Sequence, residues 1–144
     1  AGDDGDFDAL CQQLHRYQAT LRTCFTLENF DNLIKNGRMR PIVGTLLRSL
    51  GIHIIADATA EGTIHVADKA RGVGKTYRAI TALMKASKDC TDAEVVISHC
   101  ENLEGAMALK RQILADLPVK QVDLLSCRGL TSFYVMEKGL IVGY

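Results

Sequence analysis

The sequence of 144 residues has no Trp, only two Pro and no excess of charge of either sign. Acidic and basic residues number 17 each, a balance that gives no general attraction to nucleic acid or to an anionic membrane surface. It also lacks a run of about 18 apolar residues, the length that a transmembrane helix needs. We therefore expect neither a nucleic-acid partner nor a membrane span.

Motifs of several enzyme classes are missing as well. The five Cys are odd in number and include no Cys-x-x-Cys, so neither a disulfide framework nor a zinc site is indicated. We interpret the five Cys as small buried side chains of a protein in a reducing cytosol. The expected location is therefore cytoplasmic. There is no Gly-x-Ser-x-Gly. His53 and His65 lie on neighbouring predicted strands without a third ligand, so no metal and no other cofactor is expected.

What is present is enough for one globular domain. The hydrophobic fraction of 47% is normal for a folded chain. The acidic start, AGDDGDFD, has no initiator Met and is not a signal peptide. We expect residues 1–6 to be a disordered lead or the product of a cloning junction, and residues 7–144 to form a single domain.

The pattern of apolar residues predicts an α/β fold. Spacings of three and four residues, with capping residues at the ends, predict helices over residues 6–20, 28–37, 40–51, 74–89 and 102–117. Alternating or continuous apolar runs predict strands over residues 21–27, 52–58, 62–71, 93–100, 119–127 and 139–144. The strand over 93–100 is typical of one covered on both faces, and His99 at its end is expected to serve structure. A mixed sheet covered by helices accounts for this order.

The segment KARGVGKTYRA, residues 69–79, raises the question of a nucleotide site. Gly74-Lys75-Thr76 resembles the end of a phosphate-binding loop, but Lys69 stands where that loop requires glycine. Arg71 precedes the Gly-rich turn, and Arg38 follows a Gly turn between two helices. An arginine in such a place can grip a carboxylate or phosphate with two parallel hydrogen bonds. A salt bridge at the surface or at a domain interface is the alternative for either arginine.

The stretch TLENFDNLIKNGRMRPIVGTLLRSLGIHIIADATAEGTIHVADKARGVGKTYRAI resembles the DegV family of fatty-acid-binding proteins. That family shows a Leu-x-x-Leu-x-x-x-Gly-Arg run, a helix rich in Leu and Gly, a hairpin and a basic segment. The residues that match the first run are Leu27, Leu33, Gly37 and Arg38, and those that match the basic segment are Lys69, Arg71 and Lys75. The resemblance extends over about residues 20–144.

The resemblance implies both a fold and a function. The fold is that of the C-terminal domain of DegV proteins, which have two α/β domains with one long-chain fatty acid between them. Such proteins are lipid carriers, not enzymes, and present the carboxylate to a separate, DAK-type fatty acid kinase. The chain then resembles the C-terminal half alone, and the N-terminal domain of the same protein is its missing partner.

The resemblance also implies site residues. The head-group or kinase-facing residues are Arg38, Arg71, Tyr134 and Ser132, and the acyl-chain-lining residues are Leu33, Ile42, Leu46, Leu47 and Leu50. Many members carry His-x-Gly-Pro-Gly before the last strand. Here Tyr134 stands at the His position and Met136-Glu137-Lys138 replaces Gly-Pro-Gly.

Two structural expectations follow from these assignments. Arg38, Arg71 and Tyr134 should meet at one edge of the domain, since each follows or precedes a predicted element. The helix over 40–51 is apolar on more than one face, so it should form part of a tunnel wall or a dimer contact. Two other functions remain open: a structural or regulatory domain without a ligand, and a small phosphate- or nucleotide-binding domain that uses Gly72–Thr76.

Overall fold

The structure is a computed structural model that describes residues 6–39, 51–59 and 62–144. Its centre is a six-stranded sheet with the strand order β3-β2-β1-β6-β4-β5. The strands are β1 Thr23–Leu27, β2 Ile52–Ala58, β3 Ile64–Arg71, β4 Glu94–His99, β5 Gln121–Ser126 and β6 Leu140–Gly143. The helices are α1 Phe7–Thr20, α2 Asp31–Lys35, α4 Val73–Ser87, α5 Leu103–Asp116 and α6 Gly129–Val135. The predicted fold class, a mixed sheet covered by helices, is confirmed.

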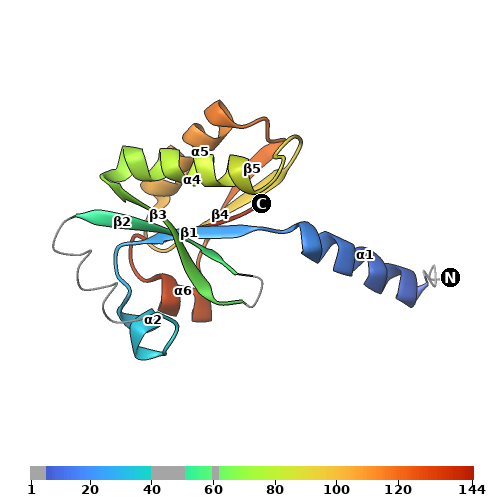
Figure 1. Cartoon of the computed structure of the whole chain (residues 1–144), viewed down its shortest axis with the longest axis horizontal. Helices are drawn as coiled ribbons and strands as arrows, with labels where there is room; N and C mark the ends of the chain where they lie inside the picture. Colours follow the sequence, from blue (N-terminus) through green and yellow to red (C-terminus); the bar gives the residue numbers. More distant parts are fainter. Residues whose placement is uncertain (1–5, 40–50, 60–61) are drawn as a thin grey trace.

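Helices cover the two faces of the sheet separately (Figure 1). Long amphipathic helices α4 and α5 lie on one face, and the shorter α2 and α6 lie on the other (Figure 1). Successive side chains of a strand point to opposite faces, so β1 contributes Cys24 to the α4/α5 cluster and Phe25 and Leu27 to the α2/α6 cluster. The described residues therefore form two hydrophobic clusters separated by the sheet.

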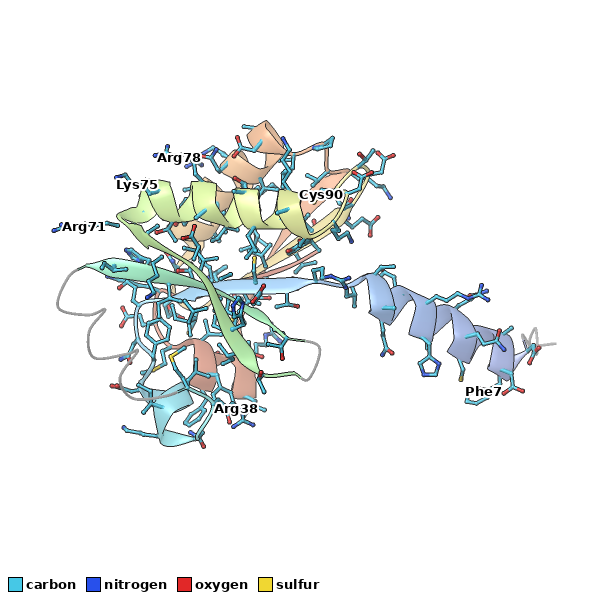
Figure 2. All side chains as sticks on the ribbon, viewed as in Figure 1. Phe7, Arg38, Arg71, Lys75, Arg78 and Cys90 are labelled. Carbon is cyan, nitrogen blue, oxygen red and sulfur yellow. The ribbon has the colours of Figure 1, made fainter. Side chains whose placement is uncertain are left out.

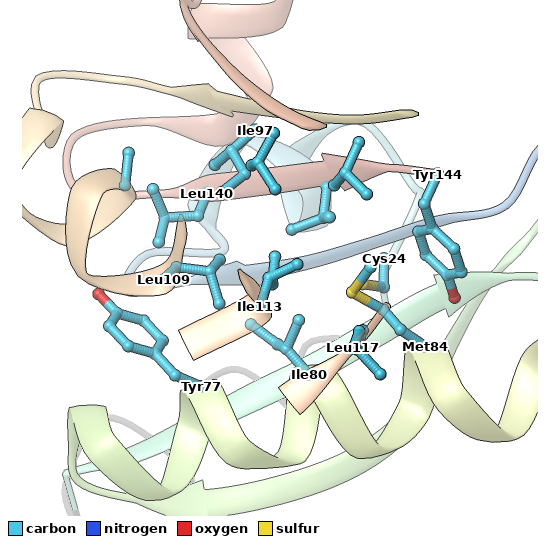
Figure 3. Packing of buried hydrophobic residues seen from close by; sticks show 14 of the residues in the cluster. Cys24, Tyr77, Ile80, Met84, Ile97, Leu109, Ile113, Leu117, Leu140 and Tyr144 are labelled. Carbon is cyan, nitrogen blue, oxygen red and sulfur yellow. The ribbon is translucent and has the colours of Figure 1, made fainter. Parts of the chain in front are cut away.

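The cluster on the α4/α5 face is the larger one. Tyr77, Ile80 and Met84 of α4 point toward the sheet, where they meet Cys24 and Leu140 (Figure 3). Their spacing of three and four residues places them on one side of the helix. This cluster contains most of the fully buried side chains of the described residues.

Most predicted elements match the structure, with short differences at their ends. The strand over 52–58 and the strand that follows it form an antiparallel hairpin, as predicted. The helix predicted over 28–37 is shorter, Asp31–Lys35. Helix α6 was not predicted at all. The helix predicted over 40–51, with Ile42, Leu46, Leu47 and Leu50, lies outside the described residues except for Gly51.

In the part of the chain that the structure describes, the strand predicted to be covered on both faces is closed on one face and half-covered on the other. Val95 and Ile97 of β4 are fully buried against the α4/α5 side, whereas Val96 and Ser98 are only half-buried. Within the described part of the chain, the α2/α6 side of the sheet is thus the more open one.

Helix α1 stands apart from both layers. It extends away from the sheet as a continuation of β1 (Figure 1), and none of its residues is buried. Asp6 caps it, because its carboxylate accepts a hydrogen bond of 3.1 Å from the backbone N–H of Asp8.

Candidate ligand-binding site

An apolar cavity of about 210 Å³ lies on the open side of the sheet, between β1, β6, α2 and α6. Phe25 and Ile141, which face each other across β1 and β6, form its floor. The residues that line it are Phe25, Leu27, Leu33, Arg38, Ile64, Tyr134, Val135 and Ile141. Arg38 and Tyr134 border the cavity but present only carbon to it, so the wholly apolar lining suits a hydrocarbon.

The position of Arg38 is set by the end of α2. Gly37 has a φ of +69°, and its N–H donates to the carbonyl of Ile34 at 3.0 Å. The N–H of Arg38 donates to the carbonyl of Leu33 at 2.8 Å. These two bonds make a Schellman motif, in which the residue after the helix adopts a left-handed conformation that glycine accepts without strain. The Gly turn expected before Arg38 is thus present at Gly37, and Arg38 directly after it borders the cavity.

Arg38 and Tyr134 meet at the mouth of the cavity. The guanidinium carbon of Arg38 lies 4.7 Å from the centroid of the Tyr134 ring, within the range of a cation–π contact. Phe133 packs edge-on against the same ring, with centroids 5.0 Å apart. The side-chain amide of Asn32 donates to the carbonyl of Phe133 at 2.6 Å. Helices α2 and α6 thus hold one another and fix the cationic and phenolic groups together.

Among the described residues that line the cavity, Arg38 is the charged one. Burial raises the pKa of the Cys127 thiol, and the neighbouring Cys100 raises it further. Both thiols pack against the same cluster as Tyr134. The Cys127 thiol therefore stays protonated near pH 7, and Arg38 is the charged side chain among those that line the cavity.

A model of the DegV family matches residues 1–141 of this chain. The chain belongs to the DegV family. A DegV domain-containing protein of Streptococcus gordonii is 32% identical over 139 residues, which are 96% of this chain and 49% of that protein. The chain thus spans about half the length of the curated relatives it matches.

Solved DegV structures have the same fold. A DegV family protein from Eubacterium eligens, loaded with heptadecanoic acid, superposes with a TM-score of 0.88 at 26% identity. The Streptococcus pneumoniae fatty acid kinase (Fak) B3 protein, loaded with linoleic acid, superposes with a TM-score of 0.86 at 31% identity. Each alignment covers 96% of this chain, and 50% and 49% of the respective solved chains.

The backbone of the last loop fits the DegV pattern at the residues where the side chains depart from it. The pattern has glycine at the positions of Met136 and Lys138, and these two residues have φ values of 55° and 65°. Left-handed conformations of this kind favour glycine. Glu137, at the Pro position between them, is not among the residues with positive φ. This agreement supports the alignment that puts Tyr134 at the DegV His position.

The predicted DegV site residues are only partly brought together. Leu33, Arg38 and Tyr134 line one cavity. Ser132 lies on the same helix as Tyr134, and its carbonyl accepts a hydrogen bond from the N–H of Met136 at 2.9 Å. Arg71 does not join them, which corrects the expectation of a single edge. It lies with Lys75 and Arg78 near the start of α4, apart from Arg38 (Figure 2).

The length of β3 separates Arg71 from Ile64, one of the residues that line the cavity. Strand β3 is at the edge of the sheet, and Ile64 at its beginning lines the cavity. Arg71 is the last residue of the same strand, seven residues further on. At about 3.3 Å per residue, this places it roughly 23 Å from Ile64.

Five residues that line the cavity were missed by the sequence analysis. They are Phe25, Leu27, Ile64, Val135 and Ile141. The alternation of Phe25 and Leu27 along β1 was a usable signal, because residues two apart lie on the same face of a strand. Val135 had no such signal, since α6 was not predicted.

The Gly72–Thr76 segment is the N-cap and first turn of α4, not a separate loop before the helix. Thr76 is only 1% exposed, and its hydroxyl donates to the carbonyl of Gly72 at 3.1 Å. A hydroxyl used in this way is turned inward, whereas a phosphate-binding loop presents it to the metal and phosphates.

The histidines singled out in the sequence have separate surroundings. Nδ1 of His65 lies 2.9 Å from a carboxylate oxygen of Asp57, whereas His53 lines a second cavity of about 270 Å³ on the α4/α5 side. His99 is buried, and its Nδ1 accepts a hydrogen bond of 3.4 Å from the N–H of Asn102. Across residues 6–39, 51–59 and 62–144, no cluster of three or more His, Cys, Asp or Glu side chains is arranged to hold a metal. Over those ranges, no helix combines the length and apolar character needed to cross a bilayer.

Proposed function

We propose that this chain is the C-terminal half of a DegV lipid carrier. The carrier holds one long-chain fatty acid between its two domains and presents the carboxylate to a separate fatty acid kinase. The observation that carries the proposal is the apolar cavity with Arg38 and Tyr134 together at its mouth. Fatty acids in two solved DegV relatives, one of them named as a fatty acid kinase B protein, support it.

The cavity is suited to part of an acyl chain. Each methylene that leaves water contributes about 0.8 kcal/mol to binding, and the lining side chains of β1 and β6 have no polar group to satisfy. A volume of about 210 Å³ is smaller than the roughly 300–1,000 Å³ of typical small-molecule sites. We therefore propose that the described residues form one wall of the acyl site and that the other half of the carrier completes it.

Arg38 and Tyr134 are suited to the carboxylate. The guanidinium offers parallel N–H donors in the geometry of a carboxylate, and the phenol offers one more donor. The contact of Arg38 with the ring of Tyr134 holds the guanidinium at the mouth before the ligand arrives. Such preorganisation reduces the ordering cost of binding. Ser132, on the same helix, is proposed as a secondary polar group at this end.

Arg71 has a different proposed role, on the side that faces the kinase. With Lys75 and Arg78 it forms an exposed basic group near the start of α4 (Figure 2). A basic surface of this kind attracts an acidic partner surface and raises the rate of encounter. Lipid binding and delivery to the kinase would then depend on different arginines.

The test separates these two roles in the full-length protein that contains this chain. Fatty acid retained after purification and the rate of acyl-phosphate formation with the partner kinase are both measured. Arg38→Ala should weaken fatty-acid binding about ten- to a hundred-fold, since it removes a charged hydrogen bond of about 1.5–3 kcal/mol. Tyr134→Phe should weaken it about three- to ten-fold, since the phenol is neutral.

Arg71→Ala should leave fatty-acid binding at the wild-type level and slow acyl-phosphate formation. Arg111→Ala, on the exposed side of α5, is the matched control for loss of one positive charge and should change neither quantity. Wild-type lipid retention in both Arg38→Ala and Tyr134→Phe would contradict the proposed site. Equal effects of Arg71→Ala and Arg111→Ala on the kinase step would contradict the proposed role of Arg71.

A further inference from the structure

Helix α1 carries an apolar face that the described chain leaves uncovered. Phe7, Leu10, Leu14 and Tyr17, here named the α1 stripe, lie on one side of the helix at spacings of three and four residues. They are 73%, 53%, 51% and 62% exposed. Leu21, directly after the helix, is a further 42% exposed.

The contrast with α4 shows what the stripe lacks. Helices α1 and α4 have similar lengths, 14 and 15 residues, and both are amphipathic. On α4 the apolar side is closed against the sheet, where Ile80 and Met84 are fully buried. A helix of about 12–15 residues without tertiary packing is only marginally stable in water. Helix α1 therefore needs a partner along its stripe.

The attachment of α1 to the body leaves that stripe free. Hydrogen bonds at the C-terminal end of α1 attach the helix to the rest of the domain. The N–H of Arg22 donates to the carbonyl of Tyr144 at 2.8 Å, and Nζ of Lys88 lies 3.3 Å from the carbonyl of Thr20. A cavity of about 580 Å³ opens beside this junction, between Leu21 and Tyr144. A partner that packs on the α1 stripe can therefore also fill this cavity at the C-terminal end of α1.

The area of the stripe indicates the kind of partner. At on the order of 200 Å² for each large side chain when fully exposed, the stripe and Leu21 leave on the order of 500–600 Å² to cover. Both sides of such a contact total about 1,000–1,200 Å². That is at the lower limit for a stable complex between separate proteins, about 1,200–2,000 Å², but well within the range for two domains of one chain, about 600–1,500 Å².

We propose that the α1 stripe docks onto the half of the carrier that this chain does not match. The relatives are about twice as long as the chain, so they contain a domain that is available for this contact. The inference rests on the two-domain organisation in the proposed function and names the surface through which the halves join. A second copy of this chain is the competing occupant.

Amide hydrogen exchange tests the proposal in the full-length protein and in the isolated 144-residue chain. In the full-length protein, amides of residues 10–20 should exchange at least ten-fold more slowly than in the isolated chain. Leu10→Glu with Leu14→Glu should remove this protection. Gln12→Glu with Ala19→Glu adds the same charges to the opposite, exposed side of α1 and should preserve it.

Two results would overturn the proposal. One is equally fast exchange of α1 in the full-length protein and in the isolated chain. The other is protection in the isolated chain that rises with concentration together with a dimer mass in light scattering, which would assign the stripe to a second copy. Fatty-acid content is measured on the same samples. If the amides of α1 are protected in full-length protein that holds no fatty acid, the docking is supported and only the proposed lipid function is contradicted.

Discussion

Replacement of Lys138 by glycine should stabilise the protein, because Lys138 has a φ of 65°. A left-handed conformation costs a non-glycine residue about 1–2 kcal/mol. Glycine also raises the conformational entropy of the unfolded chain, which stabilises the unfolded state by about 0.5–1 kcal/mol and offsets part of this relief of strain. The Lys138 side chain is exposed, and its backbone N–H and C=O keep their hydrogen bonds to Cys100 and Asn102, each 2.8 Å long. The net stabilisation is about 0.5–1 kcal/mol.

The assay is thermal unfolding followed by circular dichroism. A change of this size should raise the Tm of a domain of this length by about 1–4 °C. Glu137→Gly is the matched control, since Glu137 is exposed and its φ is not positive. It should lose about 0.5–1 kcal/mol. Met136→Gly should change little, because relief of its strain is offset by loss of a half-buried side chain.

An equal decrease of Tm for Lys138→Gly and Glu137→Gly would refute the reasoning. Residue 138 would then not be left-handed in solution. The correspondence between residues 134–138 and the His-x-Gly-Pro-Gly pattern would lose its structural support, and the assignment of Tyr134 to the ligand's head group would weaken with it.

Two further substitutions test the packing around the cavity and the core. Gly139→Ala should lower the free energy of unfolding in urea by about 1–3 kcal/mol, because a Cβ there would lie 2.5 Å from Val135 and 2.8 Å from Leu27. Gly143→Ala is the control, since the space around Gly143 is open. Equal stabilities of the two variants would contradict the close packing at Gly139. Burial raises the pKa of the Cys24 thiol from 9.0 to about 12, so its contribution to stability is complete below about pH 9 and is lost as the pH rises toward 12. The free energy of unfolding should fall by up to about 1.4 kcal/mol per pH unit in that range, and an unchanged slope in Cys24→Ala would contradict this role.

The sequence predicted the scaffold well because its signals are local. The caps at Asp6 and Asn36-Gly37, the alternation in β1 and the apolar period of α4 and α5 each depend on residues close together in the chain. Helix α6 was not predicted because residues 129–135 are mainly β-branched, aromatic or small polar residues, which are weak helix formers. It is held by packing against α2 and the sheet, which no local pattern reports.

The candidate site was harder to predict because it depends on the order of the strands. Arg38 and Tyr134 are far apart in sequence, and their meeting requires α2 and α6 to pack on the same side of β1 and β6. The family resemblance indicated that Arg38 and Tyr134 belong to one site. The positions of residues at the ends of predicted elements also suggested, wrongly, that Arg71 joins them. Arg71 is not among the residues that line the cavity, and the sequence alone did not show which of these element ends come together.

Native mass spectrometry of the full-length protein, purified from a bacterial host without added lipid, tests the central claim most directly. The account predicts a species heavier than the polypeptide by one long-chain fatty acid, which is released when the protein is denatured. Arg38→Ala should reduce the fraction of this species, and Arg111→Ala should not. A folded protein that shows only the mass of the polypeptide, both as purified and after incubation with long-chain fatty acids, would contradict the account.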